Sequence, residues 1–171
     1  MVNRCGFYTD GVNVICKTCA IEWDKGFDRQ AKRTYIMSIK AELPKELHPM
    51  EDVTSASASA IGRYMSPIFI GVEDKHGKVW SLEDLCKENV ALRNPGFFDF
   101  VYINALSDEQ KRFIQTTNCF IDVFHNPDKG RNTQASACAY YKLLNWQRKE
   151  HLLKDLDAFL EWYKSVPYYC I

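Results

Sequence analysis

One polar segment, residues 122–134, holds most of the side chains that could do chemistry. Asp122 and His125 could move protons, because carboxylates and imidazoles are the usual acid and base groups of enzymes. Lys129 and Arg131 could hold a phosphate or a carboxylate, since both are cationic and lie just before a predicted helix start. We expect these side chains to form one site that binds, and acts on, a small anionic ligand.

Amide side chains should complete this site. Asn126 and Asn132 lie in the same segment, and Asn104 follows an apolar run that we expect to be a neighbouring strand. We predict that the ligand is a nucleotide or a sugar phosphate and that the reaction is a transfer or a hydrolysis. The Gly-x-x-x-x-Gly-Lys-Ser/Thr spacing of a P-loop is absent, so the residues do not specify the bond. The alternative is structural alone: Asp122 would pair with Lys129, Arg131 or a helix N-terminus, and His125 would hydrogen-bond to the loop backbone.

The cysteines indicate a second kind of site. Cys16 and Cys19 form a Cys-x-x-Cys pair that we expect to be a knuckle at the end of a β-hairpin, and the hairpin would bring Cys5 beside them. Three thiolates are suitable ligands for a structural zinc ion, which takes four ligands in such sites. The alternative is a set of small buried thiols in the core of the hairpin. If zinc binds, its fourth ligand would come from a distant residue: Cys170, His48 or Cys86.

The elements that would position residues 122–134 belong to an α/β or α+β fold with a small mixed sheet. Residues 97–103 and 119–124 are nearly all apolar, as is typical of buried strands. A helix between them should start at Ser107, with Gln110 completing a capping box. We expect the two strands to be parallel neighbours in a βαβ arrangement, so that their ends meet at one rim of the sheet. The proposed ligand site depends on that arrangement.

Patterns elsewhere predict the remaining elements. Strict alternation over residues 33–43 favours a strand, although a helix would also fit that stretch. Small residues at 54–60 are typical of a mobile lid or of a closely packed helix. Turn and capping residues predict the other elements: a hairpin at 4–16 turning at Asp10-Gly11, a hairpin turning at 75–77, and helices starting at Ser81, near Thr133 and near Glu150.

The composition places limits on the class of protein. The chain has 171 residues, of which 46% are apolar, and we expect a single domain with a hairpin subregion at 1–22 and an α/β core at 62–171. Lys plus Arg equals Asp plus Glu, which disfavours a dedicated nucleic-acid binder because phosphate contacts require a basic excess. We find neither a signal peptide nor an apolar run long enough for a membrane helix, so a cytoplasmic protein is expected.

Two functions from different classes fit these observations. The first is binding and turnover of the small anionic ligand at residues 122–134. The second is a non-catalytic protein-binding module or inhibitor, stapled by zinc at the N-terminal hairpin, whose partner would be a host protein if the chain is a viral accessory protein. Metal analysis and a ligand screen would distinguish the two.

Overall fold

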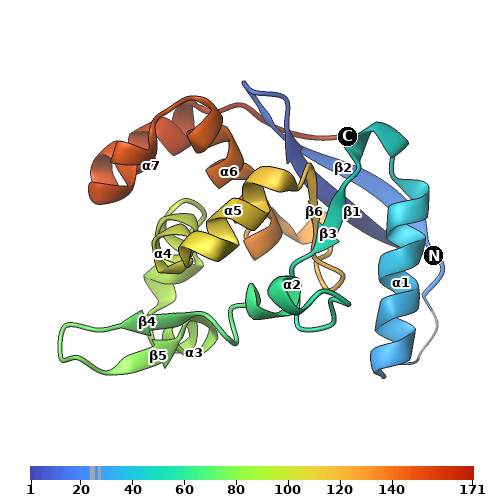
Figure 1. Cartoon of the computed structure of the whole chain (residues 1–171), viewed down its shortest axis with the longest axis horizontal. Coiled ribbons are helices and arrows are strands. Elements are labelled where there is room, and N and C mark those ends of the chain that lie inside the picture. Colours follow the sequence, from blue (N-terminus) through green and yellow to red (C-terminus); the bar gives the residue numbers. More distant parts are fainter. Residues whose placement is uncertain (24–25, 27) are drawn as a thin grey trace.

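The structure is a computed structural model that describes residues 1–23, 26 and 28–171 (Figure 1). Within them lies a five-stranded mixed sheet in the order β3-β6-β1-β2-β7, and β4 and β5 form a separate hairpin. The predicted fold class, mixed α/β with a small mixed sheet, is therefore confirmed. The strands are β1 (Val2–Thr9), β2 (Val14–Ile21), β3 (Met50–Asp52), β4 (Gly71–Glu73), β5 (Val79–Ser81), β6 (Cys119–Ile121) and β7 (Tyr168–Cys170).

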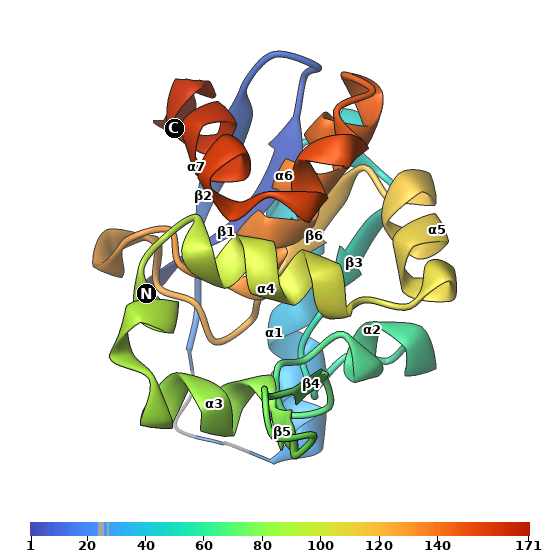
Figure 2. The same ribbon diagram turned by 90° about the vertical axis from the view of Figure 1, so that its left-hand side faces the viewer.

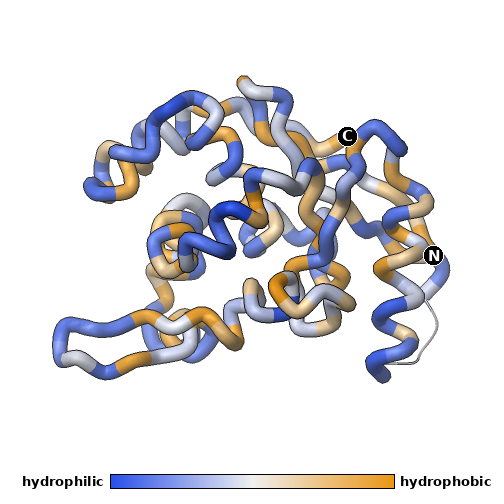
Figure 3. Tube along the Cα trace, viewed as in Figure 1, coloured by the Kyte–Doolittle hydropathy of each residue, from blue (hydrophilic) through white to orange (hydrophobic). Residues whose placement is uncertain are grey.

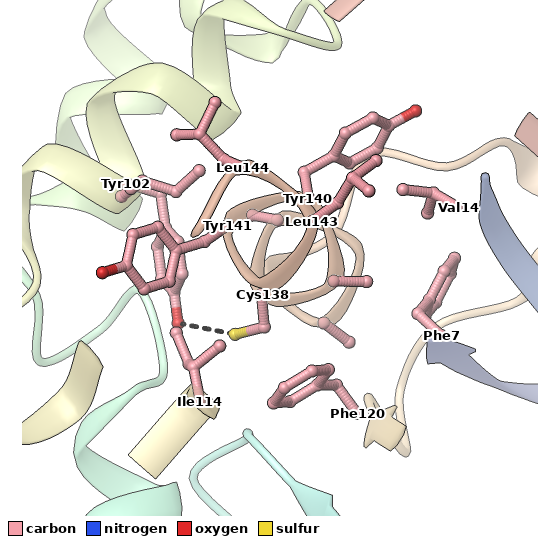
Figure 4. Close-up of a cluster of buried hydrophobic side chains, with 14 of the residues drawn as sticks. Phe7, Val14, Tyr102, Ile114, Phe120, Cys138, Tyr140, Tyr141, Leu143 and Leu144 are labelled. Carbon is pink, nitrogen blue, oxygen red and sulfur yellow. Dashed lines mark hydrogen bonds between the residues drawn. The ribbon is translucent and has the colours of Figure 1, made fainter. Parts of the chain in front are cut away.

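Helices cover both faces of the sheet (Figure 1, Figure 2). On one face, α6 packs against β1 and β6, and its buried side chains form a core with α4 (Figure 4). On the other face, α1 packs against β2 and contributes to a smaller apolar cluster. The helices are α1 (Arg29–Glu42), α2 (Ala60–Tyr64), α3 (Leu82–Glu88), α4 (Phe97–Ala105), α5 (Asp108–Thr116), α6 (Gln134–Trp146) and α7 (Leu156–Ser165).

The predicted N-terminal hairpin is confirmed, but the knuckle at its end is not. β1 and β2 pair antiparallel from Val2↔Ile21 to Thr9↔Val14, and Asp10 accepts hydrogen bonds from the turn amides of Val12 and Asn13. β2 continues as a regular strand to Ile21. Because side chains alternate along a strand, its two thiols point to opposite faces of the sheet.

Residues 97–103 form helix α4, so the strand and the βαβ arrangement predicted there are wrong. The left-handed backbone of Gly96 (φ 89°) precedes the helix, and the Asp99 side chain accepts a hydrogen bond from the Gly96 N–H. A short, uniformly apolar segment carries no period that separates a buried helix from a buried strand. The strand that runs parallel to β6 is instead β3, in the register Met50↔Cys119.

The alternating stretch at residues 33–43 also forms a helix, α1. Tyr35, Ile36 and Ile39 are buried at helical spacing, and Asp28 caps the first turn by accepting from the Ala31 N–H. The strand predicted for this stretch is therefore wrong, and the alternative, a helix, is the one that forms.

Other local predictions are confirmed. Ser81 caps α3 and Ser107 caps α5, where Gln110 completes the capping box. The hairpin turning at 75–77 joins β4 to β5, and the tube is hydrophilic at its tip (Figure 3). None of the described helices has the length and apolar character needed to span a membrane.

Candidate functional site

A pocket of about 470 Å³ lies beside the turn that follows β6. The start of α6 forms one wall, α3 and the short helix after it form another, and the segment before and after α2 closes the side. Its lining residues are Thr54, Ser55, Ser66, Pro67, Ile68, Glu83, Cys86, Lys87, Arg93, Phe98, Asp122, Phe124, Asn132, Thr133 and Gln134.

Asp122 lines this pocket as a nearly buried carboxylate, 8% exposed. Its Oδ1 accepts from the Phe124 N–H (2.9 Å), and its Oδ2 accepts from the Thr133 hydroxyl (2.6 Å). Thr133 also caps α6 by accepting from the Ala135 N–H, so the helix start and the carboxylate are fixed together. Asp122 is therefore held in one orientation at the pocket wall.

A second carboxyl group, Asp52, lies at the end of β3, next to β6, and is 1% exposed. Its two oxygens accept from the backbone N–H and hydroxyl of Thr54 and from the Val123 N–H. Burial raises the pKa of Asp52 to about 7, the Thr54 hydrogen bond opposes that rise, and the charge of Asp122 adds to it. Asp52 therefore retains a proton up to near-neutral pH, close to a carboxylate that faces the pocket.

Two cations, Lys87 and Arg93, line the pocket on the side of α3. Arg93 donates from Nε to the Cys86 carbonyl (3.0 Å), and the Asn132 amide donates to the Arg93 carbonyl (2.6 Å). Lys87 lies 3.6 Å from the Asp84 carboxylate, but both side chains are largely exposed, so water screens that pair. The pocket thus places two positive groups and two phenyl rings, Phe98 and Phe124, around the space that Asp122 faces.

The pocket brings together only some of the residues predicted from the sequence. Asn132 joins Asp122 in its lining. The His125 ring packs against Phe7 with centroids 5.6 Å apart, and burial lowers its pKa. Asn126 caps the short helix Pro127–Lys129 by accepting from the Asp128 N–H. His125 and Asn126 are thus adjacent to the pocket in sequence but not among its lining residues.

The predicted cationic turn does not line this pocket either. Lys129 is exposed, whereas Arg131 points toward the aromatic rings of Tyr163 and Tyr168, 5.0 Å from each centroid, and donates to the Tyr140 hydroxyl. Asn104 lies on α4 and lines a different cavity, of about 370 Å³, beside β4. The cations that line the pocket beside Asp122 are instead Lys87 of α3 and Arg93 of the short helix Val90–Arg93.

The predicted zinc ligands are divided between the two faces of the sheet. Cys5 and Cys16 lie in the core on the α6 face, and Cys19 lies on the α1 face. In the described part of the chain, no three His, Cys, Asp or Glu side chains are grouped so that they could hold a metal ion. Zinc binding stays a prediction, and Cys170 lies nearer to Cys16 than Cys19 does, because Cys16 and Cys170 are paired residues of β2 and β7.

Sequence reasoning missed Asp52, Lys87 and Arg93. Asp52 follows Pro49 in a stretch that reads as a loop, and its burial comes from pairing with β6. Lys87 and Arg93 are two of many surface cations, and only the packing of α3 against the rest of the chain selects them. The sequence held no local signal for Asp52, because it stands between Glu51 and Val53 in a short stretch of mixed polarity.

A family model described as "DarT1-associated NADAR antitoxin" matches residues 86–168. The matched span, slightly less than half of the chain, begins in α3 and ends in β7. Most residues that line the pocket, including Arg93 and Asp122, fall inside it. No curated protein matches the chain. Over this span the chain is therefore similar to a family of antitoxins, and the central hairpin and α1 lie outside the match.

Proposed function

We propose that this chain is an antitoxin-type protein whose pocket binds a nucleotide or a sugar phosphate and acts on it by hydrolysis or transfer. The observation that carries the proposal is the pocket itself: Lys87 and Arg93 stand on one wall, and the carboxylate of Asp122 faces the same space. The description of the matching family supports the antitoxin part. The volume, about 470 Å³, suits a ligand of nucleotide size.

The roles follow from the positions of the groups. Lys87 and Arg93 would hold the anionic group, because charge-assisted hydrogen bonds to phosphate are strong. Phe98 and Phe124 would pack against a ring of the ligand. Asp122, fixed by Thr133, would stabilise positive charge on the reacting sugar or take a proton from the attacking water.

Asp52 would act through its neighbours rather than on the ligand. It does not line the pocket, but it holds the Val123 amide and the Thr54 side chain in place. Its protonated form also avoids a second negative charge next to Asp122. We therefore assign Asp52 a positioning role.

A thermal-shift screen against AMP, ADP and ribose 5-phosphate tests the pocket. A ligand present at a hundred times its dissociation constant adds about 2.7 kcal/mol of stability. We expect Lys87→Ala and Arg93→Ala to lose most of that gain. The matched controls Lys75→Ala, in the β4–β5 turn, and Lys129→Ala, outside the pocket, should keep it.

Asp122→Asn separates binding from turnover. The amide oxygen can still accept one hydrogen bond, so we expect the thermal shift to persist while conversion of the ligand, followed by chromatography, is lost. The proposed pocket would be overturned if no ligand raised the melting temperature. It would also be overturned if Lys75→Ala and Arg93→Ala lost the ligand-induced shift equally.

A second candidate function, binding to a protein partner, is favoured by an exposed apolar patch at the end of α2 and just after it, where Ile68 also lines the pocket. Tyr64, Ile68 and Phe69 are all about half exposed, and the rings of Tyr64 and Phe69 are in contact. An antitoxin of this type would bind its toxin directly, without catalysis. Co-purification with a DarT1-type toxin, lost in Phe69→Ser and kept in Lys87→Ala, would support this alternative; a host-protein partner stays a prediction.

A further inference from the structure

Three thiols and one phenol from distant parts of the chain meet at the C-terminal edge of the sheet. Cys16 of β2 is directly paired with Cys170 of β7, and the Ile171 N–H donates to the Cys16 carbonyl at 2.9 Å. The Cys16 thiol is hydrogen-bonded to those of Cys5 and Cys170 and to the Tyr168 hydroxyl. Cys16 is fully buried, whereas Cys170 is exposed.

Hydrogen bonds shift the pKa values of Cys16 and Cys170 in opposite directions. The bond from Cys5, helped by those from Cys170 and Tyr168, lowers the pKa of Cys16 to about 7, although burial opposes that change. Burial and the hydrogen bond to Cys16 raise the pKa of Cys170 to about 11. The hydrogen bonds therefore hold a buried thiol, Cys16, directly beside a thiol that solvent can reach, Cys170.

We propose that Cys16 and Cys170 are an oxidation-sensitive pair that forms a disulfide and fastens β7 to β2. A low-molecular-weight disulfide, the oxidant, meets Cys170 first because that residue is exposed. Cys170 gives its proton to solvent, attacks one sulfur of the reagent, and releases a small thiolate.

The second step closes the link. The released thiolate takes the proton from Cys16, and Cys16 then attacks the Cys170 sulfur and displaces the second small thiolate, which takes up a proton from solvent. The two protein thiols give up two electrons and two protons in all, and one reagent disulfide becomes two thiols.

The Cys16–Cys170 disulfide would also affect residues outside the sheet, through Tyr168. The Tyr168 ring in the same strand packs against Arg131, which directly precedes Asn132 in the pocket lining. By fixing β7, oxidation would thus restrict the movement of Arg131 and of the turn that leads into the pocket lining. The disulfide itself is independent of the proposed ligand, so its test stands apart from the ligand screen.

Peptide mapping of the full chain after treatment with oxidised glutathione tests the pair. Free thiols are alkylated, and the protein is digested with trypsin without reduction. Cleavage after Arg4 and Lys17 places Cys5 and Cys16 in one peptide and Cys19 in the next, and cleavage after Lys164 releases the peptide that carries Cys170. We expect peptide 5–17 linked to peptide 165–171.

Cysteine variants show which thiol of peptide 5–17 forms the disulfide with Cys170. Cys5→Ser and the control Cys19→Ser should keep it, whereas Cys16→Ala and Cys170→Ser should lose it. Cys170 is exposed, so its variant remains informative even if Cys16→Ala fails to fold. Glutathione retained on Cys170 without a link to peptide 5–17, or a link that survives in Cys16→Ala, would overturn the proposal.

Discussion

At the scale of single residues, two buried carboxyl groups outside the pocket lining, Asp52 of β3 and Asp99 of α4, make stability depend on pH. Asp52 and Asp99 are almost completely buried, and burial raises the pKa of Asp52 to about 7 and that of Asp99 to about 6. Backbone amides at both positions oppose this effect by hydrogen bonding. Each group therefore favours its neutral form in the folded protein across the mildly acidic range.

The contribution of Asp52 and Asp99 to the free energy of unfolding should fall as the pH rises from about 4 to about 7. In that window the native state keeps protons on Asp52 and Asp99 that the unfolded state has released, so stability is complete below the unfolded pKa and is lost as the pH passes the folded pKa. We expect Asp52→Asn to remove on the order of 1 kcal/mol or more of this dependence. Urea denaturation at both ends of the window measures it.

The surface substitution Glu88→Gln provides the control for that measurement. Glu88 is exposed at the end of α3, so its neutralisation should leave the pH dependence as it is. An unchanged pH dependence of stability in Asp52→Asn would contradict the assignment.

At the scale of elements, Gly6 allows β1 to pack closely against β6 and the end of α1. Gly6 in β1 pairs with Ile121 of β6 and lies under the end of α1. A Cβ atom there would lie 2.8 Å from Leu43 Cδ1 and closer still to Cys119 Sγ. Both neighbours are fully packed in the apolar cluster beneath α1, so neither has free space to move into.

Gly6→Ala should therefore lower the free energy of unfolding by roughly 1–3 kcal/mol, the usual effect of overpacking a core. Urea denaturation followed by circular dichroism measures the change. Gly71→Ala is the matched control, because its nearest neighbour is a Val79 methyl group at 3.3 Å in the outer hairpin. Equal losses in the two variants would show that the packing at Gly6 is not special.

At the scale of the whole molecule, the last strand joins the N-terminal hairpin to the C-terminal helices. β7 adds to the edge of β2, and the Thr18 N–H donates to the Ile171 carbonyl at 2.7 Å. Tyr168 of the same strand contacts Arg131, which also packs on Tyr163 of α7. A short segment at one end of the chain thus connects the sheet, α7 and the turn before α6.

Deletion of residues 168–171 should destabilise the protein by roughly 1 kcal/mol for each backbone hydrogen bond lost, and by more through the loss of Tyr168 packing. Thermal denaturation of the shortened chain measures the effect. Tyr169→Ser is the control, because the Tyr169 side chain is 52% exposed. An unchanged melting temperature after the deletion would mean that β7 contributes nothing to the fold.

The sequence by itself determined the features that depend on near neighbours. The Asp10-Gly11 turn and the caps at Ser81, Ser107 and Thr133 are local, and the structure has each of them. Local backbone chemistry fixes these features wherever the segment lies.

Only the tertiary structure decided the rest. Residues 97–103 became a helix because their apolar side chains pack against α6, which no period in the segment could reveal. The same packing brings Lys87 and Arg93 opposite Asp122 and turns Arg131 away toward Tyr163. The pocket is formed by residues that are far apart in the chain. Their positions depend on how all the helices and strands pack together, and no single stretch of sequence specifies that packing.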